Sequence, residues 1–412
     1  MKGLLFGVAP AKELTDIPED LPELVRKLEA TPMDLREMPD PKLHGPDWMI
    51  VKPHLTGICG SDSKQVFADG EPDNPMTAVI SFPQVLGHEM VGTVVEAGPE
   101  AGHREGDRVV LNPWLSCGPR GITPECPSCQ VGDYSMCHSF TEGRLTPGIH
   151  SGNSSDATGG FAELLPVHKV MAVAVPEDVP DEAAVLGDPF AVSLHAVLRN
   201  PPPPGGTALV YGVGALGLTT VAILEALHPD VRVAAVTRFS HQADLAAKHG
   251  ATTFTYEPRD ELIRAVADWC GARVREPWAG LPWTYPGGID VVYDTVATGE
   301  TLEVGVRVAT PRGKLVISGV SCPERFEWTP WYFKELTLVG SNAFGVEEVE
   351  GRRKHAIAHY LDLAAAGRVD LRPMLTHTFR LEQWREAFLA IANQADSGAV
   401  KVAFDQRPPS WR

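Results

Sequence analysis

The sequence predicts an α/β protein in which a doubly wound parallel sheet is inserted into a β-rich domain. Over the first 200 residues, short apolar runs are broken by Gly, Pro, Asn or Asp about every ten residues, as in the antiparallel strands of a barrel or sandwich. Between about 190 and 342, β-branched runs alternate with helical segments, which predicts right-handed βαβ units. The length of 412 residues exceeds one ordinary domain. We therefore expect one domain formed by residues 1–190 and 343–412, and a second at 191–342.

The individual elements follow from the same patterns. Apolar runs predict strands at 49–51, 90–95 and 108–111, and a proline-flanked segment predicts a short helix within 16–30. A run rich in Ala, Val and Leu predicts a helix at 183–198 that ends before four consecutive prolines. The remaining expected elements are strands 208–211, 231–236, 289–293, 314–318 and 399–404, and helices 216–227, 242–249 and 352–366.

Composition and charge exclude several classes of protein. Hydrophobic residues make up 43% and charged residues 22%, which is ordinary globular composition. Asp and Glu outnumber Lys and Arg by 53 to 36, and the net charge of −17 argues against nucleic acid or an anionic membrane as a partner. No apolar stretch is long enough for a membrane span, and the first residues lack a signal-peptide pattern. We expect a cytoplasmic protein.

A glycine-rich motif predicts a dinucleotide site. Gly212 would permit a tight turn, Gly214 would let a pyrophosphate approach the backbone, and Gly217 would let a helix pack closely on the preceding strand. The helix that follows would offer free N–H groups to the phosphates. A glycine-rich turn that binds no ligand is the alternative. The motif consists of Gly212, Val213, Gly214, Ala215, Leu216 and Gly217.

The residues after the second strand of this domain favour NADP(H) over NAD(H). An acidic residue would normally bind the adenosine ribose there, but the chain has Thr237 followed by Arg238. Arg238 could pair with a 2′-phosphate, and His241 could assist. The alternative is a solvated Arg238 and bound NAD(H).

The cysteines indicate metal rather than disulfides. Four of the seven fall within 21 residues, and Cys126 and Cys129 form a CxxC pair. Thiolates of Cys117, Cys126, Cys129 and Cys137 would give a tetrahedral structural zinc site without an open position. Buried reduced thiols, or a site that has lost its metal, are the alternatives. Cys270 and Cys322 are isolated, and Cys59, His88 and Glu89 are competent ligands that are scattered in the sequence.

An ordered set of motifs covers nearly the whole chain. These motifs are GICGSD (57–62), GHEMVGTVVEAG (87–98), GDRVV (106–110), the cysteine lobe, GGFAELLPV (159–167) and GVGALG (212–217). Together they resemble the zinc-dependent medium-chain alcohol dehydrogenase family, and most closely its polyol and threonine dehydrogenase-like branch. The resemblance implies a GroES-like catalytic domain with an inserted Rossmann domain.

The resemblance also implies a catalytic zinc site. Cys59 and His88 match the family's zinc ligands, and Glu89 matches a glutamate that approaches or exchanges onto the metal. Asp188 falls where the polyol-type branch has a further acidic ligand, usually Glu, so its shorter side chain would favour a water-mediated contact. Such a mixed set of S, N and O donors suits zinc with one position open for substrate.

Three neighbouring residues are implied in the chemistry. Ser61 would hydrogen-bond the substrate oxygen and pass its proton outward, while Asp62 would orient His88. As structural alternatives, Ser61 is a turn residue and Asp62 a helix cap. Many relatives have a proton-relaying histidine where this chain has Lys64, which could relay only with a lowered pKa.

Other departures concern the cysteine lobe and the pocket. Eight residues separate Cys117 from Cys126, where the family usually has two, so Cys117 is the least secure structural ligand. Trp114 and Phe67 are candidates to line the substrate pocket. The segment 270–286 is longer than usual and could shape a pocket or an oligomer contact.

The function implied by the resemblance is reversible hydride transfer between an alcohol, polyol or carbonyl substrate and NAD(P)(H), with zinc as the Lewis acid. An aldehyde dismutase and a carbonyl reductase of the same fold are the near alternatives. A non-enzymatic zinc-ribbon scaffold is the distant one, and it would leave the glycine-rich turn unexplained. The family habit implies a homodimer or homotetramer.

Overall fold

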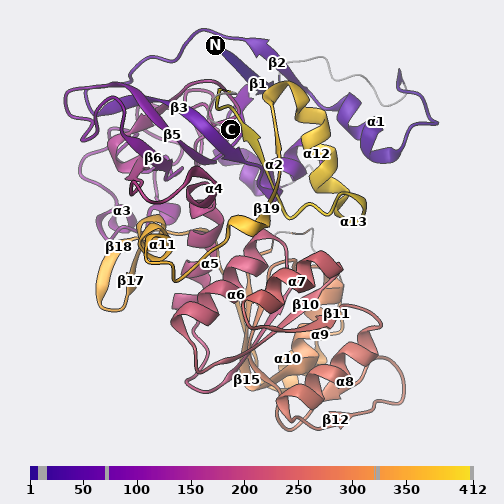
Figure 1. Ribbon diagram of the computed structural model, residues 1–412. Helices are drawn as coiled ribbons and strands as arrows, with labels where there is room; N and C mark the ends of the chain where they lie inside the picture. The colour runs from indigo at the N-terminus through magenta and orange to yellow at the C-terminus, as the bar shows by residue number, and fades with distance from the viewer. Residues whose placement is uncertain (8–15, 70–73, 320, 322–324, 409–412) are drawn as a thin grey trace. The chain divides into compact units, whose positions relative to one another are not determined.

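The computed structural model describes residues 1–7, 16–69, 74–319, 321 and 325–408, so Cys322 lies outside the described residues. The chain forms two compact units, which are traced in Figure 1. The first unit comprises Met1–Asp188 and Phe344–Arg412, and the second comprises Pro189–Ala343. In the described part of the chain, no helix is both long enough and apolar enough to cross a membrane.

The first unit is rich in strands. Its strands are β1 (Lys2–Phe6), β2 (Met33–Glu37), β3 (Trp48–Gly57), β4 (Gln84–Val85), β5 (Glu89–Ala97), β6 (Arg108–Leu111), β7 (Leu165–His168), β8 (Ala172–Ala174), β17 (Val346–Val349), β18 (Arg352–His355), β19 (Leu375–Phe379) and β20 (Lys401–Asp405). Its helices are α1 (Glu23–Ala30), α2 (Gly60–Val66), α3 (Pro127–Gln130), α4 (Asp181–Ala184), α11 (Ala356–Ala365), α12 (Trp384–Ala392) and α13 (Gln394–Ser397).

The main sheet of the first unit has the order β19-β20-β3-β5-β6-β8, and β7 also pairs with β3. Its ladders are antiparallel, as the sequence predicted, except that β19 and β20 run parallel. Alternating apolar side chains of β3 and β5, including Met49, Val51, Met90 and Val94, form one buried cluster. The side chains on one face of each of these two strands are therefore held in the core.

The register of the three central strands places their ends together. Gly57, at the end of β3, lies opposite Glu89 at the start of β5 and opposite Ala403 in β20. The residues just beyond β3, just before β5 and at the start of β20 therefore lie together, where the ends of these central strands meet. Segments more than 300 residues apart in the sequence become neighbours there.

The second unit is an open parallel sheet with the strand order β11-β10-β9-β14-β15-β16. This is the order of a doubly wound dinucleotide-binding fold, and it confirms the predicted fold class. Its strands are β9 (Thr207–Tyr211), β10 (Arg232–Thr237), β11 (Thr252–Thr255), β14 (Ile289–Asp294), β15 (Ala309–Ile317) and β16 (Thr337–Gly340), with a separate pair, β12 (Val274–Arg275) and β13 (Trp283–Thr284). Its helices are α6 (Ala215–Leu227), α7 (Ser240–Lys248), α8 (Arg259–Cys270), α9 (Gly299–Val308) and α10 (Thr329–Phe333).

The predicted single helix at 183–198 is wrong. The chain forms α4 and then α5 (Gly187–Arg199), the helix in which the division between the units falls. Pro189 explains the interruption, because proline has no N–H to donate and its ring clashes with the carbonyl four residues earlier. Proline is tolerated in the first turn of a helix, which is where α5 holds it.

The predicted helix at 352–366 begins four residues too early. Arg352–His355 form β18, which pairs with β17 through a tight turn at Glu350 and Gly351. Both turn residues have positive φ, as two-residue hairpin turns require. The helix α11 starts only at Ala356, where the ring of His355 accepts a hydrogen bond from Ile357 N. The predicted helix within 16–30 is likewise confined to Glu23–Ala30, after Pro22.

Candidate functional site

Three potential metal ligands meet where the end of β3 pairs with the start of β5. Cys59 follows β3, His88 immediately precedes β5, and Glu89 opens it. One ligand atom from each residue lies within 4.8 Å of the others. The sequence pattern proposed these three as scattered ligands, and the strand register is what brings them together. A thiolate, an imidazole and a carboxylate at this spacing fit a zinc ion.

A buried lysine, which the sequence reasoning missed, pairs with the carboxylate. Lys401 and Glu89 form an ion pair, and each is only 2% exposed. Lys401 Nζ also donates to Ile58 O at 3.0 Å. A Cβ at Gly57 would clash with the Glu89 carboxylate, so glycine makes room for the pair. The available signal was a lysine at the start of the strand β20, next to the apolar run 402–404.

Asp62 combines the two roles that the sequence left open. One carboxylate oxygen accepts a hydrogen bond from Cys59 N at 2.9 Å and caps α2. The other lies 3.7 Å from His88 Nδ1, which is too long for a hydrogen bond, and this buried nitrogen has no other partner. Asp62 therefore interacts with His88 through its charge and not through a hydrogen bond. Since Nδ1 faces Asp62, Nε2 is the His88 nitrogen suited to bind metal.

Asp188 lies near the three ligands without joining them. Its oxygens are not among the donor atoms that lie within 4.8 Å of one another. Burial, together with the charge of Glu89, raises the pKa of Asp188 to about 7 against the opposing charge of His88. This placement fits the expected indirect contact better than direct ligation.

Ser61 and Lys64 both belong to α2, one turn apart. Ser61 is exposed and Lys64 is partly buried. Neither side chain has a hydrogen-bond or ion-pair partner among the described residues. Residues three apart on a helix are neighbours on its surface, so the hydroxyl and the amine share one face.

The cysteine lobe brings all four predicted sulfurs together, including that of Cys117. The four Sγ atoms lie within 4.8 Å of one another, and those of Cys117 and Cys137 are 3.7 Å apart. Backbone N–H groups donate to three of them: Cys126 N to Cys117, His138 N to Cys126, and Ser139 N to Cys137. Donation from the Cys129 thiol and from Ser139 N lowers the pKa of Cys137 to about 5, whereas the same contact raises the pKa of the Cys129 thiol. Such donors stabilise thiolates, the form that binds metal, so the lobe fits a closed four-sulfur site.

The glycine-rich turn of the second unit has the geometry that its three glycines predicted. Gly212 has φ of 85°, and a Cβ there would clash with Val296. A Cβ at Gly214 would meet only open space, whereas one at Gly217 would clash with Gly212 O. The first turn of α6 has no side-chain cap, which leaves its N–H groups free for phosphate.

The residues expected to select the cofactor lie at the end of β10. Thr237 is buried, and its hydroxyl donates to Phe254 O. Arg238 is exposed, and its guanidinium lies over the rings of Phe239 and Tyr256 at 5.5 and 5.6 Å. It forms no ion pair with a described carboxylate. His241 stacks on Phe239, and its buried Nε2 has no hydrogen-bond partner.

The two candidate pocket residues differ in their placement. Phe67 belongs to the hydrophobic core and contacts Phe388, with ring centroids 6.4 Å apart. Trp114 contacts Phe344 and also His150, whose ring lies 4.6 Å from that of His88. Trp114 therefore lies close to the metal ligands, and Phe67 has a packing role.

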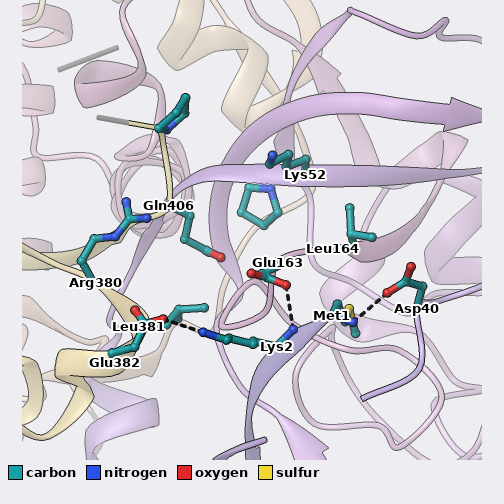
Figure 2. A pocket seen from close by; sticks show the side chains of 12 residues that line it. Met1, Lys2, Asp40, Lys52, Glu163, Leu164, Arg380, Leu381, Glu382 and Gln406 are labelled. Carbon is teal, nitrogen blue, oxygen red and sulfur yellow. Dashed lines mark hydrogen bonds and ion pairs between the residues drawn. The ribbon is translucent and has the colours of Figure 1, made fainter. Parts of the chain in front are cut away.

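A separate cavity of about 560 Å³ opens on the first unit (Figure 2). Its charged groups mostly satisfy one another. Lys2 pairs with Glu382 and the terminal amine of Met1 pairs with Asp40, while Arg380 donates to backbone carbonyls. None of the predicted site residues lines it.

Family models match both parts of the chain. The alcohol dehydrogenase GroES-like domain matches residues 45–177, and the zinc-binding dehydrogenase model matches residues 215–358. The chain belongs to the zinc-dependent medium-chain alcohol dehydrogenase family. Membership makes it an oxidoreductase that interconverts alcohols and carbonyl compounds with zinc and a nicotinamide cofactor. A zinc-ribbon scaffold would not account for the second match.

Two curated relatives extend over most of the chain. A probable D-xylulose reductase A from Aspergillus clavatus is 28% identical over 354 residues, which cover 85% of this chain and 88% of the relative. An L-threonine 3-dehydrogenase from Deinococcus deserti is 29% identical over 374 residues, covering 90% and 95%. Both belong to the type of dehydrogenase that the motifs indicated.

Two solved structures share the fold. A protein from Sinorhizobium meliloti assigned as a zinc-binding dehydrogenase, solved bound to NADP, is 26% identical, with a TM-score of 0.69 and coverage of 98% and 99%. An alcohol dehydrogenase from Escherichia coli, solved with NADH, is 24% identical, with a TM-score of 0.71 and coverage of 98% and 99%. The two forms of nicotinamide cofactor therefore both occur on this fold.

Proposed function

We propose that this family member catalyses the reversible oxidation of an alcohol or polyol at a zinc ion held by Cys59, His88 and Glu89. The observation that supports this most directly is the convergence of these three donors within 4.8 Å of one another. Residues 1–190 and 343–412 act as the catalytic domain, and residues 191–342 bind the nucleotide. Three protein donors leave one zinc position for substrate.

A zinc ion in this site supplies a Lewis acid that lowers the pKa of the substrate hydroxyl, and an oxidised nicotinamide accepts the hydride. The surrounding residues hold and orient the side chains that bind the zinc ion. Asp62 holds the start of α2, which Cys59 immediately precedes, and faces the imidazole of His88. Lys401 restrains Glu89 through their ion pair, and Asp188 contacts the site indirectly.

The proton leaves through the exposed face of α2. Ser61 accepts the hydroxyl proton of the substrate and passes it outward, because its own hydroxyl is exposed and has no partner among the described residues. Lys64, one turn further along the same helix, is the next group on this face. Water at this surface completes the route.

The cysteine lobe holds a second, structural zinc ion through Cys117, Cys126, Cys129 and Cys137. The three backbone N–H groups aimed at its sulfurs support this assignment. All four donors are used, so this ion leaves no position for substrate. Its role is to fix the lobe that follows β6.

The turn at 212–217 binds the pyrophosphate of NADP(H), which we propose is preferred over NAD(H). The unpaired guanidinium of Arg238 and the unpartnered Nε2 of His241 support a 2′-phosphate site. The variant Arg238→Ala should weaken NADPH binding at least tenfold and leave NADH binding within about threefold. Lys248→Ala, which removes an exposed cation at the far end of α7, is the matched control. Equal losses for both cofactors would contradict the preference.

The second unit also carries a surface suited to self-association. Trp278, Trp328, Tyr332 and Phe333 are all more than half exposed, and the last three lie close together in the sequence around α10. Exposed aromatic side chains are typical of protein interfaces. We therefore propose a homodimer or homotetramer that buries these side chains. Light scattering on wild type and on Tyr332→Glu tests this, since a charge there should lower the assembled mass.

Turnover with a matched pair of cysteine variants tests the function. Wild type should reduce NADP⁺ or NAD⁺ in the presence of some member of a panel of alcohols and polyols. Cys59→Ser should lose at least a hundredfold in turnover, whereas Cys270→Ser, which alters a cysteine outside both groups, should retain it. Full activity of Cys59→Ser would overturn the proposal. Turnover of aldehydes without added nucleotide would instead indicate a dismutase.

A further inference from the structure

His150 lies beside the candidate zinc ligands, although no motif pointed to it. Its ring centroid is 4.6 Å from that of His88, and the rings are inclined by 46°. On its other side lies the indole of Trp114, at 6.1 Å in an edge-on arrangement. The imidazole of His150 is therefore in direct contact with a candidate zinc ligand on one side and with an aromatic ring on the other.

The backbone holds His150 firmly in this position. His150 and Trp114 form an antiparallel bridge, flanked by hydrogen bonds from Leu115 N to Ile149 O and from Ser151 N to Pro113 O. Asn153 Oδ1 also accepts from the backbone N–H groups of Ile149 and His150, at 2.8 and 3.0 Å. An anchored backbone is what a residue that orients a ligand requires.

The tautomer of His150 follows from its one hydrogen bond. Nδ1 lies 2.7 Å from Ser151 O, and a carbonyl can only accept, so Nδ1 carries the proton. In the neutral ring Nε2 is then an acceptor. This nitrogen has no partner among the described residues.

Trp114 supplies a complementary donor. Its side chain is 6% exposed, and its Nε1–H is buried without a hydrogen-bond partner. An unpaired buried donor is costly, so native structures rarely leave such a group without a partner. A hydroxyl group can satisfy both neighbours, because it donates to an imidazole nitrogen and accepts from an indole.

We propose that His150 positions the substrate by accepting a hydrogen bond from a second hydroxyl, on the carbon next to the one oxidised. Trp114 donates to the same oxygen. The enzyme therefore selects vicinal diols and polyols over alcohols with a single hydroxyl. This inference rests on the proposed function and specifies its substrate class.

The test compares substrates that differ only in the second hydroxyl. Wild type should show a higher kcat/KM for 2,3-butanediol than for 2-butanol, and likewise for longer pairs. The variant His150→Phe keeps an aromatic ring without the acceptor, and should reduce the diol preference about 10- to 100-fold, with the monoalcohol changed less than threefold. Trp114→Phe should act in the same direction. His150→Gln, which restores an acceptor, should recover part of the preference.

Two further measurements separate positioning from a general defect. Zinc content should be unchanged in His150→Phe, and calorimetric titration of the zinc-loaded protein with 2,3-butanediol should show at least tenfold weaker binding. His377→Phe, a substitution on β19 that leaves the site untouched, should match wild type throughout. Equal losses for diol and monoalcohol, or an unchanged preference, would overturn the role of His150 while leaving the dehydrogenase function intact. Failure of wild type to turn over any alcohol or polyol would overturn the proposed function itself.

Discussion

At the scale of single residues, the site includes a buried charge, that of Lys401, which the sequence motifs do not indicate. The donors Cys59, His88 and Glu89 could be predicted, because their motifs are local and resemble a known family. Lys401 could not, because its partner Glu89 lies more than 300 residues away and only the register of β20 against β3 brings them together. The same holds for His150, whose position depends on its pairing with Trp114.

Removing the buried lysine should destabilise the first unit. Lys401→Met would leave the Glu89 carboxylate buried without its ion-pair partner, and should lower the free energy of unfolding by about 3–5 kcal/mol. The double variant Lys401→Met with Glu89→Gln should recover part of this loss, since no uncompensated charge remains. Urea unfolding followed by circular dichroism measures both. A loss below about 1 kcal/mol in the single variant would contradict the account.

The partly buried carboxylate of Asp181 predicts a pH dependence. Burial raises the pKa of Asp181, but the hydrogen bond with His54 and the charges of Arg108 and Arg407 outweigh this effect, so its pKa is lowered overall. The unfolded chain then binds a proton more readily than the folded one. The stabilisation is fully present above the unfolded pKa of about 3.9 and is lost as the pH falls through the lower folded value.

The variant Asp181→Asn tests this sign. It should be less stable than wild type by about 1–3 kcal/mol at neutral pH, because His54 loses a charged partner. The difference should shrink below about pH 4, where wild type loses the same contribution. Urea midpoints measured from pH 3 to 7 provide the check, and a difference that grows towards acid would contradict it.

At the scale of elements, most of the doubly wound sheet could be predicted, because each βα unit is specified by local periodicity and turn residues. Two elements differ from the prediction because of a few residues. Pro189 divides a predicted helix, and the turn at Glu350 and Gly351 lets Arg352–His355 pair as a strand. The segment that leads to His150 has no regular structure and could not be predicted. Arg120 holds it, because its guanidinium donates to five backbone carbonyls: those of Leu115, Glu142, Leu145, Thr146 and Gly148.

Arg120 should therefore be hard to replace. It is 1% exposed, and Arg120→Met would leave buried carbonyls without donors, at a cost of about 3–5 kcal/mol in the free energy of unfolding. Arg120→Lys should recover little, because an ammonium group cannot reproduce the planar fork of donors. Arg144→Met, an exposed arginine of the same segment, should cost less than about 1 kcal/mol. Comparable losses for Arg120→Met and Arg144→Met in thermal unfolding would contradict this role.

At the scale of the whole molecule, the chain consists of two units, each with its own potential binding groups. The first holds two groups of donors, one with three residues and one with four cysteines. The second holds a glycine-rich turn on a parallel sheet in the dinucleotide-binding order. Fold and family could be predicted because ordered motifs span both units. The substrate class could not, because the residues around the ligands come from segments without a recognisable pattern.

Zinc content per chain is the measurement that tests this account most directly. The two donor groups predict two zinc ions per wild-type chain, falling to one in Cys59→Ser and to one in Cys129→Ser. Binding of NADPH, followed by fluorescence, should persist in Cys59→Ser, because the nucleotide turn lies in the other unit. Wild-type protein that binds NADPH but takes up no zinc, even when zinc is supplied, would contradict the proposed roles of both donor groups.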